Sequence, residues 1–307
     1  MAEMTRVASN FKAVHFVFTL GEGRGFRMMT PKDHSVPNDE RHWRIRQILI
    51  PSCWLLRSCS GVNLFEDRAE FELFFNSLSS NQIFPNGYTL EQPSAWVTPR
   101  LVKIGFENTS VSPLVFSATQ AGLKYVDRWL ARNKLDVSNL VCLTLRNAQI
   151  ETFRNANMES WLEFARVISW EGYQPVIVPD TEEVLEATLE DYQSEFPVFW
   201  PGPVNLELRA ALYQRAKICM SDNGAAAFIH QFMPESNSVV FQPPSKIPEG
   251  LKTVERQEGV LGIKRGEQFP FFTSNQWYCW EDDSFDVILG EFRKLEGAIK
   301  AKQADGS

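Results

Sequence analysis

Two stretches of the sequence place polar residues at the end of an expected strand. Residues 139–146, NLVCLTLR, form an apolar run that ends in Arg146, and residues 219–229, CMSDNGAAAFI, pass from apolar residues into Ser221, Asn223 and Gly224. A guanidinium group binds a phosphate through two parallel hydrogen bonds. A turn from strand to helix directs backbone N–H groups and the positive end of the helix dipole towards an anion. Together these stretches predict a site for an anionic ligand.

Each stretch also has a purely structural interpretation. Arg146 could pair with a surface carboxylate, and the Ser-Asp-Asn-Gly turn could be an ordinary helix N-cap, because Ser, Asp and Asn all cap helices without a ligand. The anion site requires the two strand ends to be neighbours, since open parallel sheets bind ligands beyond the carboxyl ends of their strands. The functional interpretation of the turn therefore depends on Arg146.

Several common catalytic patterns are absent from the sequence. There is no Gly-Lys dipeptide for a Walker A loop, and neither a His-Glu-x-x-His nor a Gly-x-Ser-x-Gly motif. Gly21 and Gly23 match the first two positions of the dinucleotide fingerprint, but Phe26 takes the place of the third glycine. The four histidines are dispersed. We therefore expect no metal site and no bound cofactor, and the glycine-rich segment is either a surface turn or a ligand-contacting loop.

The amino-acid composition indicates which classes of partner and which cellular compartment to expect. The 307 residues carry a net charge of −7 without a long basic run, which disfavours a nucleic-acid partner. The five cysteines are odd in number and scattered, as expected for reduced, buried thiols in a cytoplasmic protein. No apolar run reaches about 18 residues, so no transmembrane segment is expected, although peripheral membrane contact stays open. Lys12 and His15 interrupt residues 11–20, which we interpret as a strand and not as a signal peptide.

The elements that must position these residues alternate regularly in the second half. Apolar runs such as QPVIVPD, which ends at Asp180, alternate with amphipathic stretches such as the one from Asn157 to Gly172. This alternation predicts an α/β fold with a doubly wound parallel sheet. The first half is less regular, and its segment 101–107, LVKIGFE, suggests a short strand. We predict two Rossmann-like lobes, residues 1–135 and 136–307, separated near the linker KLDVSNL.

The order of features across residues 139–290 resembles the C-terminal, nucleotide-sugar-binding lobe of GT-B glycosyltransferases. The similar groups are the heptosyltransferases and the fucosyltransferases that include the nodulation enzymes. The resemblance implies that Arg146, Ser221, Asn223 and Gly224 hold the donor diphosphate. It also implies that Asp180, Asp282 and Asp283 contact the base or the sugar of the donor.

The resemblance implies transfer of a sugar from a nucleotide-sugar donor to a saccharide or lipid-linked acceptor, with the first lobe on the acceptor side. Cationic and N–H groups would stabilise the departing diphosphate, and a carboxylate or histidine would deprotonate the acceptor. Glu22, His34 and Asp39 are the candidates for that base, and the sequence does not choose among them. The alternatives are a nucleotide-sugar epimerase and a non-catalytic binding or assembly protein with a GT-B-like fold.

Overall fold

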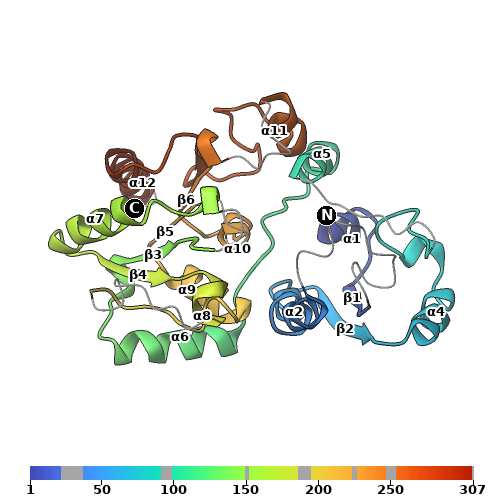
Figure 1. Ribbon diagram of the computed structural model, residues 1–307. Coiled ribbons are helices and arrows are strands. Elements are labelled where there is room, and N and C mark those ends of the chain that lie inside the picture. Colours follow the sequence, from blue (N-terminus) through green and yellow to red (C-terminus); the bar gives the residue numbers. More distant parts are fainter. Residues whose placement is uncertain are drawn as a thin grey trace. The chain divides into compact units, whose positions relative to one another are not determined.

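The chain forms two compact α/β units, Met1–Pro113 and Leu114–Ser307 (Figure 1). The computed structural model describes residues 1–21, 37–90, 99–148, 152–185, 195–222, 227–246 and 254–305. In these ranges no helix is long and apolar enough to cross a membrane.

The first unit contains a pair of parallel strands, β1 (Val14–Thr19) and β2 (Cys59–Phe65). The strand expected within residues 11–20 is therefore confirmed. Phe65 at the end of β2 packs against Phe71 and Phe74 of the following helix, with ring centroids 5.7 and 5.2 Å apart. The helices of this unit are α1 (Ala2–Ala8), α2 (Asn38–Arg44), the π-helical turn η2 (Ile45–Leu49), α3 (Ile50–Cys53), α4 (Arg68–Asn76), the 3₁₀ turn η3 (Ser80–Gln82) and α5 (Pro99–Thr109).

Segment 101–107 belongs to helix α5, so the strand expected there is wrong. Val102 of this helix is buried, whereas Leu101 and Ile104 are 41 and 37 % exposed. α5 packs on α1, and Gly105 allows the close approach, because a Cβ atom there would lie 3.1 Å from Cε of Met4. The face of α5 that includes Gly105 therefore packs on α1, while Leu101 and Ile104 lie on its exposed side.

A five-stranded parallel sheet forms the centre of the second unit. Its strands are β3 (Leu140–Thr144), β4 (Gln174–Val178), β5 (Ile218–Ser221), β6 (Ser238–Phe241) and β7 (Gln276–Cys279), in the order β4-β3-β5-β6-β7. Residues throughout β3, β5, β6 and β7 are buried, as expected when both faces of a parallel sheet are covered.

Helices cover both faces of this sheet. Figure 1 shows α7 (Met158–Trp170) and α12 (Phe285–Asp305) on one face, and α6 (Gln120–Arg132) and α9 (Leu206–Arg215) on the other. The predicted α/β fold with a doubly wound parallel sheet is therefore confirmed for this unit. The remaining helical segments are η4 (Val137–Asn139), η5 (Thr152–Arg154), α8 (Thr181–Leu185), α10 (Ala227–Gln231), η7 (Pro244–Lys246) and α11 (Val254–Leu261).

The division between the units lies between residues 113 and 114, earlier than the linker near residue 136. The difference is helix α6, which packs on α9 of the second unit. Trp129 of α6 meets the ring of Phe199 edge to face at 4.9 Å, and the backbone N–H of Ala118 donates to Oε1 of Gln214 at 2.9 Å. Helix α6 is thus part of the second hydrophobic core.

Candidate functional site

The strand order reverses between β3 and β5 at the carboxyl edge of the second unit's sheet. The chain runs from β3 to β4 on one side, then crosses to β5 on the other, which makes the gap between β3 and β5 the topological switch point. Ligands of open α/β sheets bind in the crevice at such a point. Arg146 follows β3, Asp222 follows β5, and the backbone N–H of Arg146 donates to Oδ2 of Asp222 at 2.5 Å. The structure therefore brings together the two strand ends selected from the sequence.

The Arg146 side chain faces the end of β4. Its Nη1 lies 3.9 Å from Oδ2 of Asp180, and the two side chains are 13 and 19 % exposed. The two groups form an ion pair, but 3.9 Å is too long for a hydrogen bond between them. Asp180 is held by α8, since its Oδ1 accepts from the N–H of Glu182 at 3.1 Å and its own N–H donates to Glu183 at 2.9 Å. Arg146 and Asp180 are thus neighbours at the edge of the sheet.

Ser221 is fully buried, and its hydroxyl group interacts with a residue inside the protein. Its Oγ lies 3.0 Å from Nε2 of His230 in α10, and the ring of Tyr213 meets that imidazole edge to face at 5.1 Å. Burial, assisted by the charge of Arg209, lowers the pKa of His230 to about 3, so this imidazole is neutral. In this arrangement the Ser221 side chain has no exposed surface for a ligand to contact.

Asp283 is buried and its carboxylate joins three segments. Its Oδ2 accepts from the backbone N–H of Asn157 at 2.8 Å and from Nε1 of Trp161 at 3.0 Å, while its Oδ1 pairs with Nζ of Lys246 at 2.5 Å. Asp282 is exposed and accepts a hydrogen bond from Oγ of Ser245 at 2.5 Å. Asp282 therefore has a carboxylate open to solvent, whereas the carboxylate of Asp283 is occupied by protein donors.

Lys246 is a residue of this edge that the sequence reasoning missed. It ends η7, which follows β6, and its side chain is 13 % exposed. The signal was the one that identified Arg146: a cationic residue shortly after an apolar run, here SVVFQ. Lys246 is close enough to Asp222 to lower the pKa of that carboxyl group. The cationic side chains of this edge therefore include both Arg146 and Lys246.

Asp222 is the second residue that the sequence reasoning missed, because it was treated only as part of a turn. The residue is 2 % exposed, and burial raises the pKa of its carboxyl group to about 7. The N–H of Arg146 and the charge of Lys246 oppose this rise, while Asp283 and Asp180 add to it. Asp222 is therefore poised between its charged and neutral forms near neutral pH.

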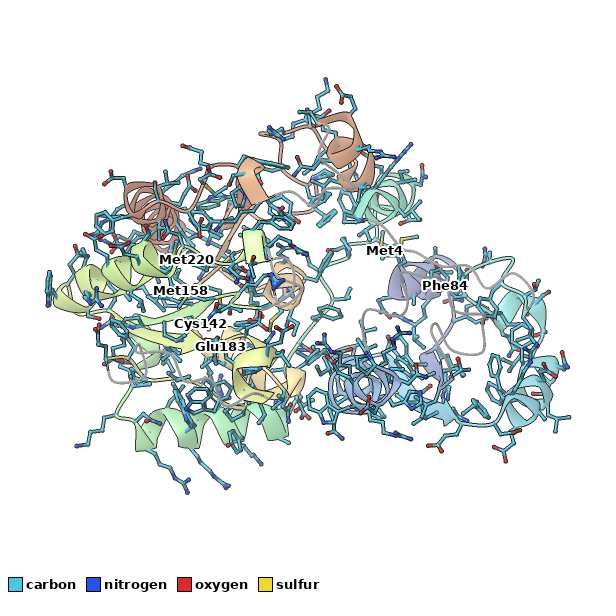
Figure 2. All side chains as sticks on the ribbon, in the orientation of Figure 1. Met4, Phe84, Cys142, Met158, Glu183 and Met220 are labelled. Atoms are coloured by element: carbon cyan, nitrogen blue, oxygen red, sulfur yellow. The ribbon has the colours of Figure 1, made fainter. Side chains whose placement is uncertain are left out.

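The acidic character of this edge is stronger than the sequence suggested. It includes the buried Glu183 in addition to Asp180, Asp222 and Asp283, and Glu183 accepts a hydrogen bond from Nδ2 of Asn147 at 3.1 Å. Figure 2 labels Glu183, together with Cys142 of β3 and Met220 of β5. Across the ranges that the structure describes, no three His, Cys, Asp or Glu side chains form a group that could hold a metal ion. The cationic side chains of this edge can bind an anion, and its carboxylates can accept hydrogen bonds from hydroxyl groups.

Four other predicted site residues lie outside the described residues: Glu22, His34, Asn223 and Gly224. Asp39 is described and lies exposed in the first turn of α2, in the first unit. Of the seven residues assigned to donor binding, the structure therefore describes five, all after the carboxyl ends of strands or at such an end: Arg146, Asp180, Ser221, Asp282 and Asp283.

The sequence matches no family model and no curated protein. The solved structures that are similar to the chain include two glycosyltransferases. The ADP-heptose lipopolysaccharide heptosyltransferase II of E. coli is 13 % identical, with 61 % of this chain and 54 % of that chain covered and a TM-score of 0.39. A glycosyl transferase of family 9 from Veillonella parvula is 11 % identical, with 96 % of this chain and 97 % of that chain covered and a TM-score of 0.48. The match spans about half the length of the heptosyltransferase.

Proposed function

We propose that the chain is a glycosyltransferase that moves a sugar from a nucleotide-sugar donor to a saccharide or lipid-linked acceptor. The observation that carries the proposal is the position of Arg146 at the switch point between β3 and β5, where it is joined to Asp222. The type of reaction comes from the sequence resemblance described above, and the donor's location comes from the sheet topology.

Glycosyl transfer develops negative charge on the departing diphosphate. Arg146 and Lys246 would stabilise that charge electrostatically, because both are largely removed from water and held by carboxylates, at 3.9 Å from Asp180 and 2.5 Å from Asp283 respectively. Asp180 and the exposed Asp282 would accept hydrogen bonds from hydroxyl groups of the ribose or the transferred sugar. We assign the diphosphate to Arg146 and Lys246 in preference to Ser221, whose hydroxyl is buried against His230.

The acceptor's proton needs a base, and we keep Glu22, His34 and Asp39 of the first unit as candidates. No metal ion or cofactor is part of the proposal. The five cysteines are all free thiols, which suits the reducing cytoplasm, where we place the reaction.

The first test is stabilisation by ligands. A ligand that binds only the native state raises the melting temperature of the protein. Of GDP, UDP, ADP and the corresponding sugar nucleotides, those with the base that the site recognises should therefore raise it. Arg146→Ala should weaken binding of that nucleotide about tenfold or more, since a charge-assisted contact is lost. Arg166→Ala is the matched control, because Arg166 pairs bidentately with Glu195 at 2.8 and 2.9 Å, away from the strand ends.

The second test separates the enzyme classes. A transferase should release the nucleoside diphosphate faster when an acceptor is added, whereas an epimerase should convert the donor's sugar without an acceptor. Binding without either reaction would support the non-catalytic alternative. Equal nucleotide affinity of Arg146→Ala and Arg166→Ala would overturn the donor site.

A further inference from the structure

We infer that binding of a diphosphate at the switch point brings a proton into the protein, onto the carboxyl group of Asp222. The identity of the ligand rests on the proposed function. The transfer of the proton rests on the charges and contacts at the edge of the sheet. Asp222 is thus a positioning residue that adjusts the charge of the site to that of its ligand.

Asp222 lies at the switch point, between the ends of β3 and β5, and is kept out of water. It directly follows the last residue of β5, is 2 % exposed, and accepts the backbone N–H of Arg146 through Oδ2 at 2.5 Å. A ligand at the switch point, beyond the carboxyl ends of β3 and β5, therefore comes close to this carboxyl group. A buried charge interacts strongly with a nearby one, because little solvent screens the pair.

Charged groups that follow several strands act on Asp222. Asp180 after β4 and Asp283 before α12 are like charges, and Lys246 after β6 is the opposing cation, while the guanidinium of Arg146 after β3 lies 3.9 Å from Asp180. Among the described residues, the elements around this edge also carry Glu182 and Glu183 in α8, Glu207, Arg209, Tyr213 and Arg215 in α9, and the neutral His230 in α10, which bonds Ser221. With Asp222 ionised, the carboxylates of Asp180, Asp222 and Asp283 stand with the cations Arg146 and Lys246 among the described residues of this edge.

A diphosphate adds at least two negative charges to this arrangement. Neither Arg146 nor Lys246 can gain further positive charge, so the excess is relieved most directly by neutralising a carboxylate. Asp222 is the candidate, because burial already raises its pKa to about 7. The proton comes from solvent and bonds to Oδ1, while Oδ2 continues to accept the N–H of Arg146. No other bond changes.

The linkage fixes how affinity depends on pH. If the ligand raises the proton affinity of Asp222, the apparent Kd increases with pH above the pKa of the free site. The increase approaches tenfold per pH unit for one linked proton. Asp222→Asn keeps an oxygen to accept the N–H of Arg146 and is neutral at every pH. This variant should therefore bind the diphosphate with little pH dependence, and at about pH 8 at least as tightly as the unmodified protein.

The experiment is calorimetric titration of the full chain with GDP, UDP and ADP at about pH 8. Repeating each titration in buffers of different ionisation enthalpy gives the number of protons taken up. The unmodified protein should take up close to one proton more than Asp222→Asn. Asp127→Asn is the control, because Asp127 is a carboxylate of α6 paired with Arg215 at 2.6 Å, and it should behave as the unmodified protein does. Equal uptake by the unmodified protein and Asp222→Asn would overturn the inference.

A second measurement needs no variant. Difference infrared spectroscopy of the unmodified protein should show a protonated carboxyl band that appears on nucleotide binding, and its absence would also overturn the inference. Inorganic pyrophosphate serves as a further probe. If it binds with Asp222-dependent proton uptake while no nucleotide binds, the inference holds and the proposed function fails. Nucleotide binding without that uptake refutes only the inference, and failure of every probe to bind refutes both.

Discussion

Ser221 and Asp222 are adjacent at the end of β5, yet they contact different parts of the protein. Successive side chains of a strand point in opposite directions. Ser221 is directed at His230, whereas the carboxyl group of Asp222 reaches the backbone of Arg146. Ser221 is therefore a contact of the core, whereas Asp222 joins the ends of two neighbouring strands.

At the residue scale, we expect Asp222→Asn to change how stability depends on pH. The pKa of Asp222 is about 7 in the folded protein and near the ordinary 3.8 when unfolded. A raised carboxyl pKa contributes stability at low pH that is lost as pH rises towards the folded pKa. From about pH 5 to pH 8, the free energy of unfolding of the variant should therefore gain about 2–3 kcal/mol relative to the unmodified protein.

Urea unfolding at the two pH values measures this difference. Asp127→Asn serves again as the control. The difference between its free energy of unfolding and that of the unmodified protein should be nearly the same at both pH values, because the Arg215 hydrogen bond lowers the pKa of Asp127 from its ordinary 3.8. If the free energies of unfolding of Asp222→Asn and the unmodified protein differed by the same amount at both pH values, the raised pKa of Asp222 would be contradicted.

We further expect Ser221→Ala to affect stability and not nucleotide affinity. The substitution leaves Nε2 of the buried His230 without its partner, which costs about 1–3 kcal/mol. Because the hydroxyl is fully buried, the Kd of the stabilising nucleotide should stay within about twofold of the original, as measured by calorimetry. A large loss of affinity with unchanged stability would restore Ser221 as a ligand-binding residue.

At the scale of elements, Asp283 connects the start of α7 with the segment after β6. The N–H of Asn157, immediately before α7, and the indole of Trp161 within it both donate to the same carboxylate oxygen. A negative charge at this end of a helix is also favoured by the helix dipole. Lys246 is thereby held at the edge of the sheet by the helix that packs on the sheet's face.

We expect Asp283→Ala to destabilise the second unit by about 3–5 kcal/mol, because it leaves the largely buried Lys246 and two N–H donors without their acceptor. Urea unfolding measures the loss. In a double-mutant cycle, Lys246→Met combined with Asp283→Ala should cost about 0.5–3 kcal/mol less than the two single losses added together. Simple additivity would show that the pair is not coupled.

At the scale of the whole molecule, the chain has two cores, and the second begins before the predicted linker. Helix α6 buries Leu123, Val126 and Leu130. Gly122 permits its close approach to α9, since a Cβ atom there would lie 3.3 Å from Cβ of Ala211. The second unit therefore needs the residues from 114 onward.

Truncation tests this boundary. A fragment of residues 114–307 should unfold cooperatively, because it contains the whole of the second unit. A fragment of residues 136–307 lacks α6 and exposes the apolar side chains that α6 covers, so it should melt at a lower temperature or aggregate. Calorimetric scans of the two fragments give the comparison, and equal melting temperatures would place α6 outside the unit.

Local patterns in the sequence were enough to predict the α/β alternation, the buried strands and the polar residues at their ends, because the period of apolar residues reflects the element that contains them. They did not predict α5, which packs on α1 through a face that includes Gly105. Tertiary structure alone decided the strand order, and with it the meeting of Arg146 and Asp222, the pairing of Lys246 with Asp283, and the burial of Ser221. These relations join residues far apart in the chain, and the electrostatic free energy of each group depends on which charges surround it in the folded protein.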